Sequence, residues 1–170
     1  FWDKSAWDIC SKFRAVAMVF EFICLGNIVL WWWFPVRSLS CSIFPSAWIS
    51  LVIGAIILSI GGLIMFLGMK DAGAESSSPS PDTELFGGIY RYIRHPQALG
   101  EFPMFPALAL LVNSLFLFVV LVVYVLFYLP IMILVEERDL VRRFGKKYTE
   151  YKRNTGALFP KFNKKKRKNN

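Results

Sequence analysis

The longest apolar segments of this chain constrain its fold more than any other feature. Segments 13–34 and 46–69 each supply the roughly 20 residues that a helix needs to cross the hydrocarbon core of a bilayer. The first segment closes on three consecutive tryptophans at 31–33, which are typical of a helix end in the lipid headgroup region. Because 55% of all residues are hydrophobic, more than the roughly 45–50% of soluble domains, we predict an integral membrane protein.

A third apolar stretch, 102–135, is too long for one ordinary membrane span. Asn113 and Ser114 lie near its middle, and these residue types favour a turn. We therefore predict two further helices, 96–112 and 115–135, that form a tight hairpin. The expected fold class is an all-α membrane protein with about four transmembrane helices, the last two paired in this hairpin.

Polar segments separate and follow these helices. Segment 71–95 begins with a stretch rich in Ser, Pro and Gly, which predicts a loop. Segment 136–153 alternates charged residues with apolar ones at three- and four-residue spacing, which predicts an amphipathic helix at the membrane surface. Segment 161–170 is a basic tail. We expect one integral membrane domain over 1–170; because the chain begins with Phe rather than Met, a further membrane helix could precede it.

The basic residues are distributed unevenly between the two sides of this predicted topology. All but one of the 20 Lys and Arg residues fall on the side that holds both termini and the 71–95 loop, whereas Arg37 falls on the other. The positive-inside rule then places the termini and the loop in the cytoplasm. The membrane would be a prokaryotic plasma membrane or the endoplasmic reticulum.

Charge and cysteine content narrow the range of partners. The net charge of +8 comes mostly from residues that flank apolar segments, so we expect contact with lipid headgroups and not with nucleic acid. Cys10, Cys24 and Cys41 are widely spaced and include no C-x-x-C pair, so we expect neither a metal site nor a disulfide framework. The sequence leaves the oligomeric state open.

Two polar motifs, His95–Pro96 and Glu136–Glu137, should meet at the open end of the hairpin on its cytoplasmic side. Proline suits the first turn of a helix, and the free N–H groups of that turn favour a carboxylate. The acidic pair could balance a cationic ligand or accept hydrogen bonds from ribose hydroxyls. Gly88, just upstream, lets the backbone approach a ligand closely. S-adenosylmethionine, which carries both a carboxylate and positive charge, would suit this arrangement.

Here the sequence resembles a known family. Residues 87–96 read Gly-Gly-Ile-Tyr-Arg-Tyr-Ile-Arg-His-Pro, and the hairpin is followed by Glu-Glu and, at 144–153, by Phe-Gly-Lys-Lys-Tyr-Thr-Glu-Tyr-Lys-Arg. This combination resembles the isoprenylcysteine carboxyl methyltransferases, which share their cofactor-binding region with the phospholipid methyltransferases. The resemblance covers about half of the chain, roughly 83–159, and implies a membrane-embedded methyltransferase that holds S-adenosylmethionine between the hairpin and the C-terminal segment. The positions that match the family's cofactor contacts are Asp82, Thr83, Glu84, Leu85, Tyr90, His95, Pro96, Gln97, Glu136 and Glu137.

Two positions depart from the family's pattern. Ala98 stands where the family has a tyrosine, and Met132 stands where the carboxyl methyltransferases have an arginine that resembles a clamp for the substrate carboxylate. An apolar side chain cannot supply that charge, so a lipid amine, a thiol or another apolar-tailed acceptor is at least as well supported as a prenylcysteine. Both residues are candidate substrate contacts. For an amine acceptor, which must first lose a proton, Glu101 near the open end of the hairpin could act as the base.

Three functions fit these features. The first is a membrane-embedded methyltransferase that uses S-adenosylmethionine on a lipidic or apolar-tailed acceptor, with a phospholipid or thiol methyltransferase of the same fold as its alternative. The second is an NADPH-dependent reductase, because sterol reductases carry a similar Arg-His-Pro hairpin, although they are much longer. The third is a non-enzymatic membrane protein, which Ala98 and Met132 would suit.

Overall fold

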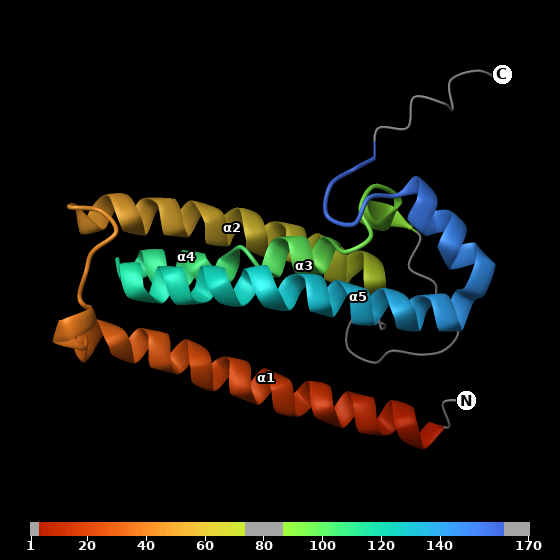
Figure 1. The fold of residues 1–170 in the computed structure, drawn as a ribbon, viewed down its shortest axis with the longest axis horizontal. Helices are drawn as coiled ribbons and strands as arrows, with labels where there is room; N and C mark the ends of the chain where they lie inside the picture. Colours follow the sequence, from red (N-terminus) through yellow and green to blue (C-terminus); the bar gives the residue numbers. More distant parts are fainter. Residues whose placement is uncertain (1–3, 74–86, 162–170) are drawn as a thin grey trace.

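The chain folds into helices, and the structure, a computed structural model, describes residues 4–73 and 87–161 (Figure 1). Its elements, in order, are α1 (Lys4–Trp33), the 3₁₀ turn η1 (Arg37–Leu39), α2 (Ala47–Ala72), the 3₁₀ turn η3 (Gly88–Arg91), α3 (Pro96–Glu101), α4 (Met104–Leu111) and α5 (Leu115–Asn154). Within those two described ranges there is no β-strand, only two isolated bridges. The predicted all-α class is therefore confirmed.

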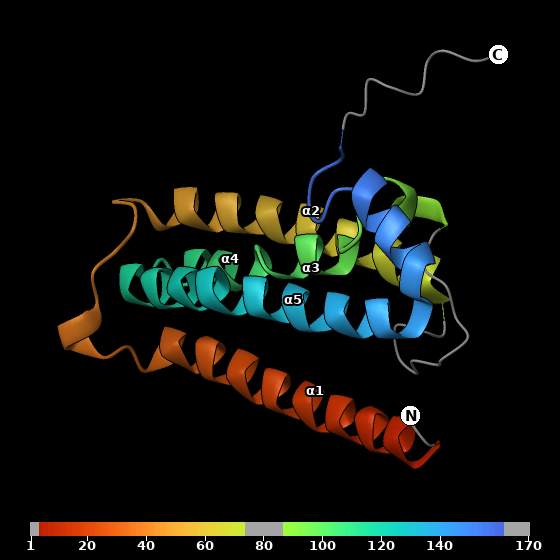
Figure 2. The ribbon, with the colours of Figure 1, turned by 45° about the vertical axis from the view of Figure 1, so that its right-hand side comes forward.

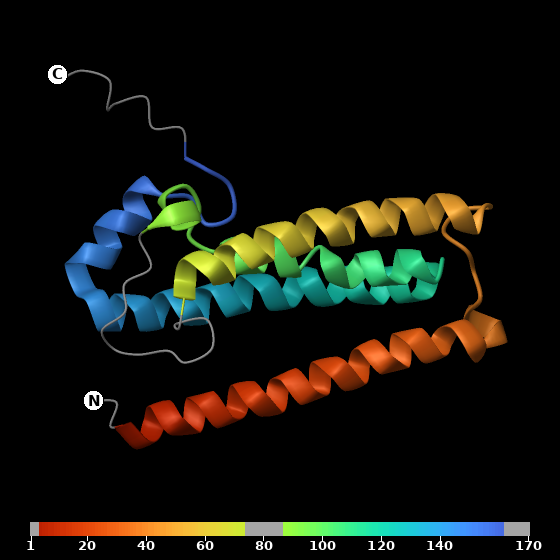
Figure 3. The ribbon, with the colours of Figure 1, turned by 180° about the vertical axis from the view of Figure 1, so that it is seen from behind.

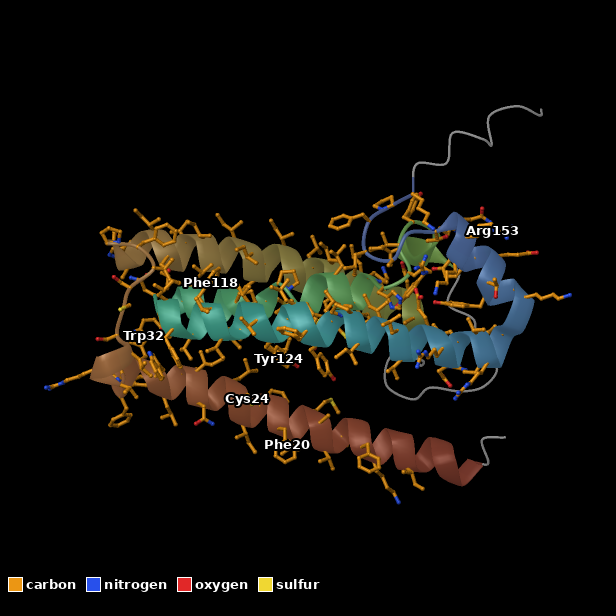
Figure 4. All side chains as sticks on the ribbon, viewed as in Figure 1. Phe20, Cys24, Trp32, Phe118, Tyr124 and Arg153 are labelled. Atoms are coloured by element: carbon orange, nitrogen blue, oxygen red, sulfur yellow. The ribbon has the colours of Figure 1, made fainter. Side chains whose placement is uncertain are left out.

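Three of the described helices, α1 over Ala15–Trp33, α2 and α5, are long and apolar enough to cross a membrane. Large apolar side chains on all three are exposed, among them Phe20, Phe66 and Phe127. Figure 4 shows such side chains along the length of the helices, whereas nitrogen- and oxygen-bearing side chains gather at the end near Arg153. An apolar surface of this extent requires lipid around it, so the chain is an integral membrane protein.

The third expected helix, 96–112, is interrupted in the structure. It forms two short helices, α3 and α4, that meet at Phe102 and Pro103. Proline has no backbone N–H to donate and its ring crowds the preceding turn, so the closely spaced Pro103 and Pro106 explain the break. Neither short helix is long enough to cross a bilayer by itself. A fourth crossing made by the pair together stays a prediction.

The predicted turn at Asn113 and Ser114 separates α4 from α5. Asn113 adopts a positive φ of 49°, and its side-chain Oδ1 accepts hydrogen bonds from the backbone N–H groups of Ile43 and Phe44. Ser114 caps α5, because its Oγ accepts a hydrogen bond of 3.3 Å from Leu117 N. The turn therefore reverses the chain and also anchors the segment that leads into α2.

Small residues on α2 allow α3 and α4 to pack closely against it. Gly54, Gly61 and Gly68 recur every seven residues and are all buried. A Cβ at Gly61 would lie 2.6 Å from the carbonyl oxygen of Gly100 in α3, so no larger side chain fits there without a shift. Close backbone approach through small residues is typical of helix packing in membranes. This packing fixes α3, and with it His95, against α2.

Helix α5 continues well beyond the predicted span 115–135. The structure has no break at Glu136, and the first departure from helical geometry is Gly145, whose φ of 55° and ψ of −126° bend the helix. After this bend the last turns of α5 lie beside η3 (Figures 2 and 3). The described chain begins and ends at this same end of the molecule (Figure 1). That this end faces the cytoplasm stays a prediction.

Candidate functional site

His95 lies between the two acidic residues at the open end of the hairpin. Its ring Nδ1 is 3.0 Å from Glu136 Oε2, and its Nε2 is 3.3 Å from Glu137 Oε1. His95 immediately precedes α3, and both glutamates lie on α5 just beyond its apolar part. The structure therefore brings together the two motifs that the predicted hairpin places side by side. The histidine side chain is almost fully buried, with 1% of it exposed.

The two glutamates differ in what they contact. Glu137 is 5% exposed and lies 2.7 Å from Arg94 Nη2 and 2.5 Å from Lys152 Nζ. The side chain of Glu136 is 45% exposed, and among the described residues its carboxylate makes a hydrogen bond only to His95. Glu137 is thus occupied by basic groups of the protein, whereas Glu136 presents an oxygen that a ligand can reach.

The basic groups keep Glu137 ionised. Burial by itself raises the pKa of a carboxyl group, but hydrogen bonds from Lys152, Arg94 and His95 oppose this and together hold the pKa of Glu137 below its ordinary value. A buried carboxylate with three such partners has its charge balanced locally. Glu137 therefore joins the segment between η3 and α3 to the part of α5 that follows the bend at Gly145.

Arg94 connects Glu137 to residues 155–160, which we call the C-terminal strap. Its Nη1 donates to the carbonyl oxygens of Thr155 and, at 3.0 Å, Lys152. The backbone N–H of Arg94 donates to Gly156 O at 2.9 Å, and that of His95 donates to Ala157 O at 3.0 Å. The strap is therefore paired along its first residues with the segment that carries His95.

Tyr90, Gln97 and Tyr151 form a second polar group next to Glu136. Gln97 Nε2 donates to the Tyr90 hydroxyl at 3.2 Å, and the Tyr151 hydroxyl donates to Tyr90 O at 2.5 Å. Burial, with a smaller contribution from the nearby charge of Glu136, raises the pKa of Tyr90 well above its ordinary value. Tyr90 therefore remains a neutral hydroxyl that can both donate and accept.

Asp71, at the end of α2, holds the turn that precedes Tyr90. Its Oδ2 accepts a hydrogen bond of 2.7 Å from Ile89 N. Gly88 has a φ of 51°, and a Cβ at this position would overlap the Asp71 carboxylate, so only glycine fits here. In the structure the group that lies against Gly88 is this carboxylate of the protein itself. Contact between Gly88 and a cofactor stays a prediction.

The remaining residues predicted from the sequence take no part in the hydrogen bonds described above. Asp82, Thr83, Glu84 and Leu85 lie outside the described residues. Pro96 is buried, and the neighbouring Gln97 N lies against Gly68 of α2. Glu101 ends α3, partly exposed and about 8 Å beyond Pro96 along the helix axis. Met132 is partly buried, one helical turn before Glu136. Their roles as cofactor, proton-transfer or acceptor contacts stay predictions.

An apolar pocket of about 180 Å³ lies between α3, α4 and α5. All its lining side chains are apolar, and they include Ala98, Leu99, Phe102, Leu126, Leu129 and Leu158. Leu99 N donates to His95 O at 3.0 Å, so the pocket begins within one helical turn of the histidine. An all-apolar lining binds apolar groups and offers no partner for a charged one.

Sequence reasoning missed several of these residues. The sequence patterns do not single out Arg94, Asp71, Lys152 or Leu158 as parts of the site. The sequence does contain one signal for Arg94 and Lys152. If Glu137 is buried, it needs cationic partners, and nearby Lys and Arg residues are the candidates. Asp71 and Leu158 carry no sequence signal, since their roles depend on contacts with residues 17 or more positions away.

Comparison with known proteins relates this chain to a protein family and to a similar methyltransferase. The model of the phospholipid methyltransferase family matches residues 49–147, which include α3, α4, His95 and both glutamates. A methanethiol S-methyltransferase of Bradyrhizobium diazoefficiens is 33% identical over 88 residues. That alignment covers 52% of this chain and 29% of the length of the relative.

Proposed function

Because this chain belongs to the phospholipid methyltransferase family, we propose that it transfers a methyl group from S-adenosylmethionine to an uncharged, apolar acceptor reached from the bilayer. One observation carries the proposal: buried His95 holds the accessible carboxylate of Glu136, and a wholly apolar pocket begins within one helical turn of this histidine. The carboxylate suits a cationic cofactor, and the apolar pocket beside it suits an apolar acceptor.

The polar side chains around His95 fit S-adenosylmethionine. The half-exposed carboxylate of Glu136 can accept hydrogen bonds from an ammonium group or from ribose hydroxyls, and it offsets positive charge. The neutral Tyr90 hydroxyl and the Gln97 amide add groups that both donate and accept. The cofactor, when bound, supplies an electrophilic methyl group. We propose Asp82, Thr83, Glu84 and Leu85 as further contacts because they match the family's cofactor-binding strip.

The acceptor is uncharged on this proposal. Ala98 lines the pocket, and Met132 lies one turn from Glu136, so neither position offers a positive charge to a carboxylate substrate. A thiol is favoured by the methanethiol S-methyltransferase among the relatives. Methylation of a thiol would release S-adenosylhomocysteine and the thiol proton, which would pass to water. A phospholipid amine, which the family's name suggests, is the second candidate; it is cationic until it loses a proton, which Glu101 would take.

The residues of this chain contribute alignment and exclusion of water. His95 fixes the Glu136 carboxylate, and the pocket holds the apolar part of the acceptor at one side of it. Methyl displacement needs a close, linear approach of acceptor and methyl group, so holding the two in place supplies much of the rate. A dry pocket also keeps water from competing for the methyl group.

A labelled-methyl transfer assay tests this proposal. Protein reconstituted in nanodiscs is incubated with methyl-labelled S-adenosylmethionine and a panel of alkanethiols, phospholipids and prenylcysteines. We expect transfer to thiols, and we expect the Glu136→Gln variant to transfer far more slowly when S-adenosylmethionine is limiting. Transfer to prenylcysteine carboxylates would contradict the conclusion drawn from Met132, and absence of transfer to every acceptor would contradict the function itself.

A further inference from the structure

Leu158 occupies a distinctive place among the residues that line the apolar pocket. The other lining residues lie in or between α3, α4 and α5, whereas Leu158 comes from the C-terminal strap. It shares the pocket with Ala98 and Leu99, the lining residues nearest His95 in the chain. Because the adjacent Ala157 O accepts a hydrogen bond from His95 N, Leu158 lines the part of the pocket next to His95.

The strap holds Leu158 in place from both sides. Before it, Gly156 O and Ala157 O accept hydrogen bonds from the backbone of Arg94 and His95. After it, the chain folds back so closely that a Cβ at Gly156 would overlap the carbonyl oxygen of Phe159. A residue held in this way acts as a wall of the pocket with a defined position.

We propose that Leu158 closes the pocket beside His95 and thereby limits the size of the apolar group that an acceptor can place there. This inference rests on the proposed function and names the acceptor class more closely: uncharged molecules, such as thiols, with a short apolar part. A cavity of roughly 150 Å³ lined by apolar residues accommodates benzene. The pocket, at about 180 Å³, is of that order.

Two neighbouring residues of the strap provide a matched pair of variants. Leu158→Ala removes about three side-chain carbons from the pocket wall, so it should admit chains about three carbons longer. Phe159→Ala is the control, because the Phe159 side chain is 75% exposed and does not line the pocket. Leu158→Phe makes the pocket smaller and should exclude all but the shortest chains.

The experiment has a binding readout that does not depend on methyl transfer. Thermal unfolding of each variant in nanodiscs is measured with straight-chain alkanethiols of increasing length. We expect the chain length that stabilises most to increase by about three carbons in Leu158→Ala, to decrease in Leu158→Phe and to be unchanged in Phe159→Ala. An equal optimum in the wild type and both Leu158 variants, or no length preference in the wild type, would overturn the inference.

The same series is then assayed for methyl transfer, which separates this inference from the proposed function. A shift in the binding optimum without transfer to any thiol or lipid would contradict the function and retain the role of Leu158. Transfer by the wild type with an unshifted length preference in both Leu158 variants would contradict the role of Leu158 and retain the function.

Discussion

The ring Nδ1 of His95 lies 3.0 Å from Glu136 Oε2, although the two residues are 41 positions apart in the chain. The neighbouring Glu137 is bound by Arg94 and Lys152, so the two adjacent carboxylates have separate roles. Glu136 is accessible to a ligand, and Glu137 holds the surrounding segments together. Each of these roles leads to a different experimental result.

Substitution of the two glutamates should separate cofactor binding from stability. We expect Glu136→Gln to weaken binding of S-adenosylhomocysteine about 10- to 100-fold, because it removes a charged hydrogen-bond acceptor, with little change in the unfolding temperature. Glu137→Gln should lower stability by about 3 kcal/mol, because Arg94 loses its buried partner. Calorimetry and thermal unfolding measure the two effects. Equal effects of both substitutions on both readouts would show that the carboxylates are not divided in this way.

Arg94 should hold the C-terminal strap through the shape of its guanidinium group. Arg94→Lys keeps the charge but cannot reproduce the contacts to both Glu137 and the carbonyl oxygen of Thr155. We therefore expect faster amide hydrogen exchange across the strap in this variant, measured by mass spectrometry. Arg91→Lys is the control, because Arg91 is exposed. Unchanged exchange in Arg94→Lys would mean that backbone pairing alone holds the strap.

The close packing of α2 on α3 predicts a position-specific effect of alanine. Gly61→Ala should destabilise the protein by about 1–3 kcal/mol, because the new Cβ would meet the backbone of Gly100. Gly62→Ala, one residue along the same helix, has nothing within 4 Å of the new Cβ and should be neutral or slightly stabilising. Unfolding in detergent or nanodiscs compares the two. A neutral Gly61→Ala would mean that the helices are less closely packed than described.

The lowered pKa of Glu137 predicts how stability depends on pH. As pH falls, the unfolded chain takes up a proton at the ordinary carboxyl pKa of 4.5, before the folded protein does. The stability that Glu137 supplies is therefore complete well above this value, declines below it and is lost under the folded-state pKa. The difference in unfolding temperature between the wild type and Glu137→Gln should shrink between neutral pH and pH values below 4.5. A difference that is constant or grows on acidification would contradict the assignment.

Much of the helical arrangement could be predicted from the sequence. Long uncharged segments identify α2 and the apolar part of α5, and the turn at Asn113 and Ser114 follows from residue type. Once that hairpin is drawn, the approach of His95 to Glu136 follows from chain geometry, because both motifs lie at its open end. Local composition and the predicted helical hairpin were sufficient to predict that His95 and Glu136 lie close together.

Other features depend on contacts that a sequence pattern does not reveal. The helix expected over 96–112 is interrupted at Pro103, and α5 continues past Glu136. Where a helix ends depends on helix-breaking residues and on packing together, so the bounds of these helices differ from the expected ones. The strap has no periodicity, and its pairing with Arg94 and His95 joins segments about 60 residues apart. Leu158 and the apolar pocket therefore became visible only in three dimensions.

We propose that His95 and Glu136 form the binding site of a methyl donor. Isothermal titration of nanodisc-embedded protein with S-adenosylhomocysteine, and in parallel with NADPH, tests it most directly. We expect the wild type to bind S-adenosylhomocysteine and not NADPH, and Glu136→Gln to bind the former about tenfold more weakly or worse. Binding of NADPH alone, or equal affinity of both proteins for S-adenosylhomocysteine, would contradict the account.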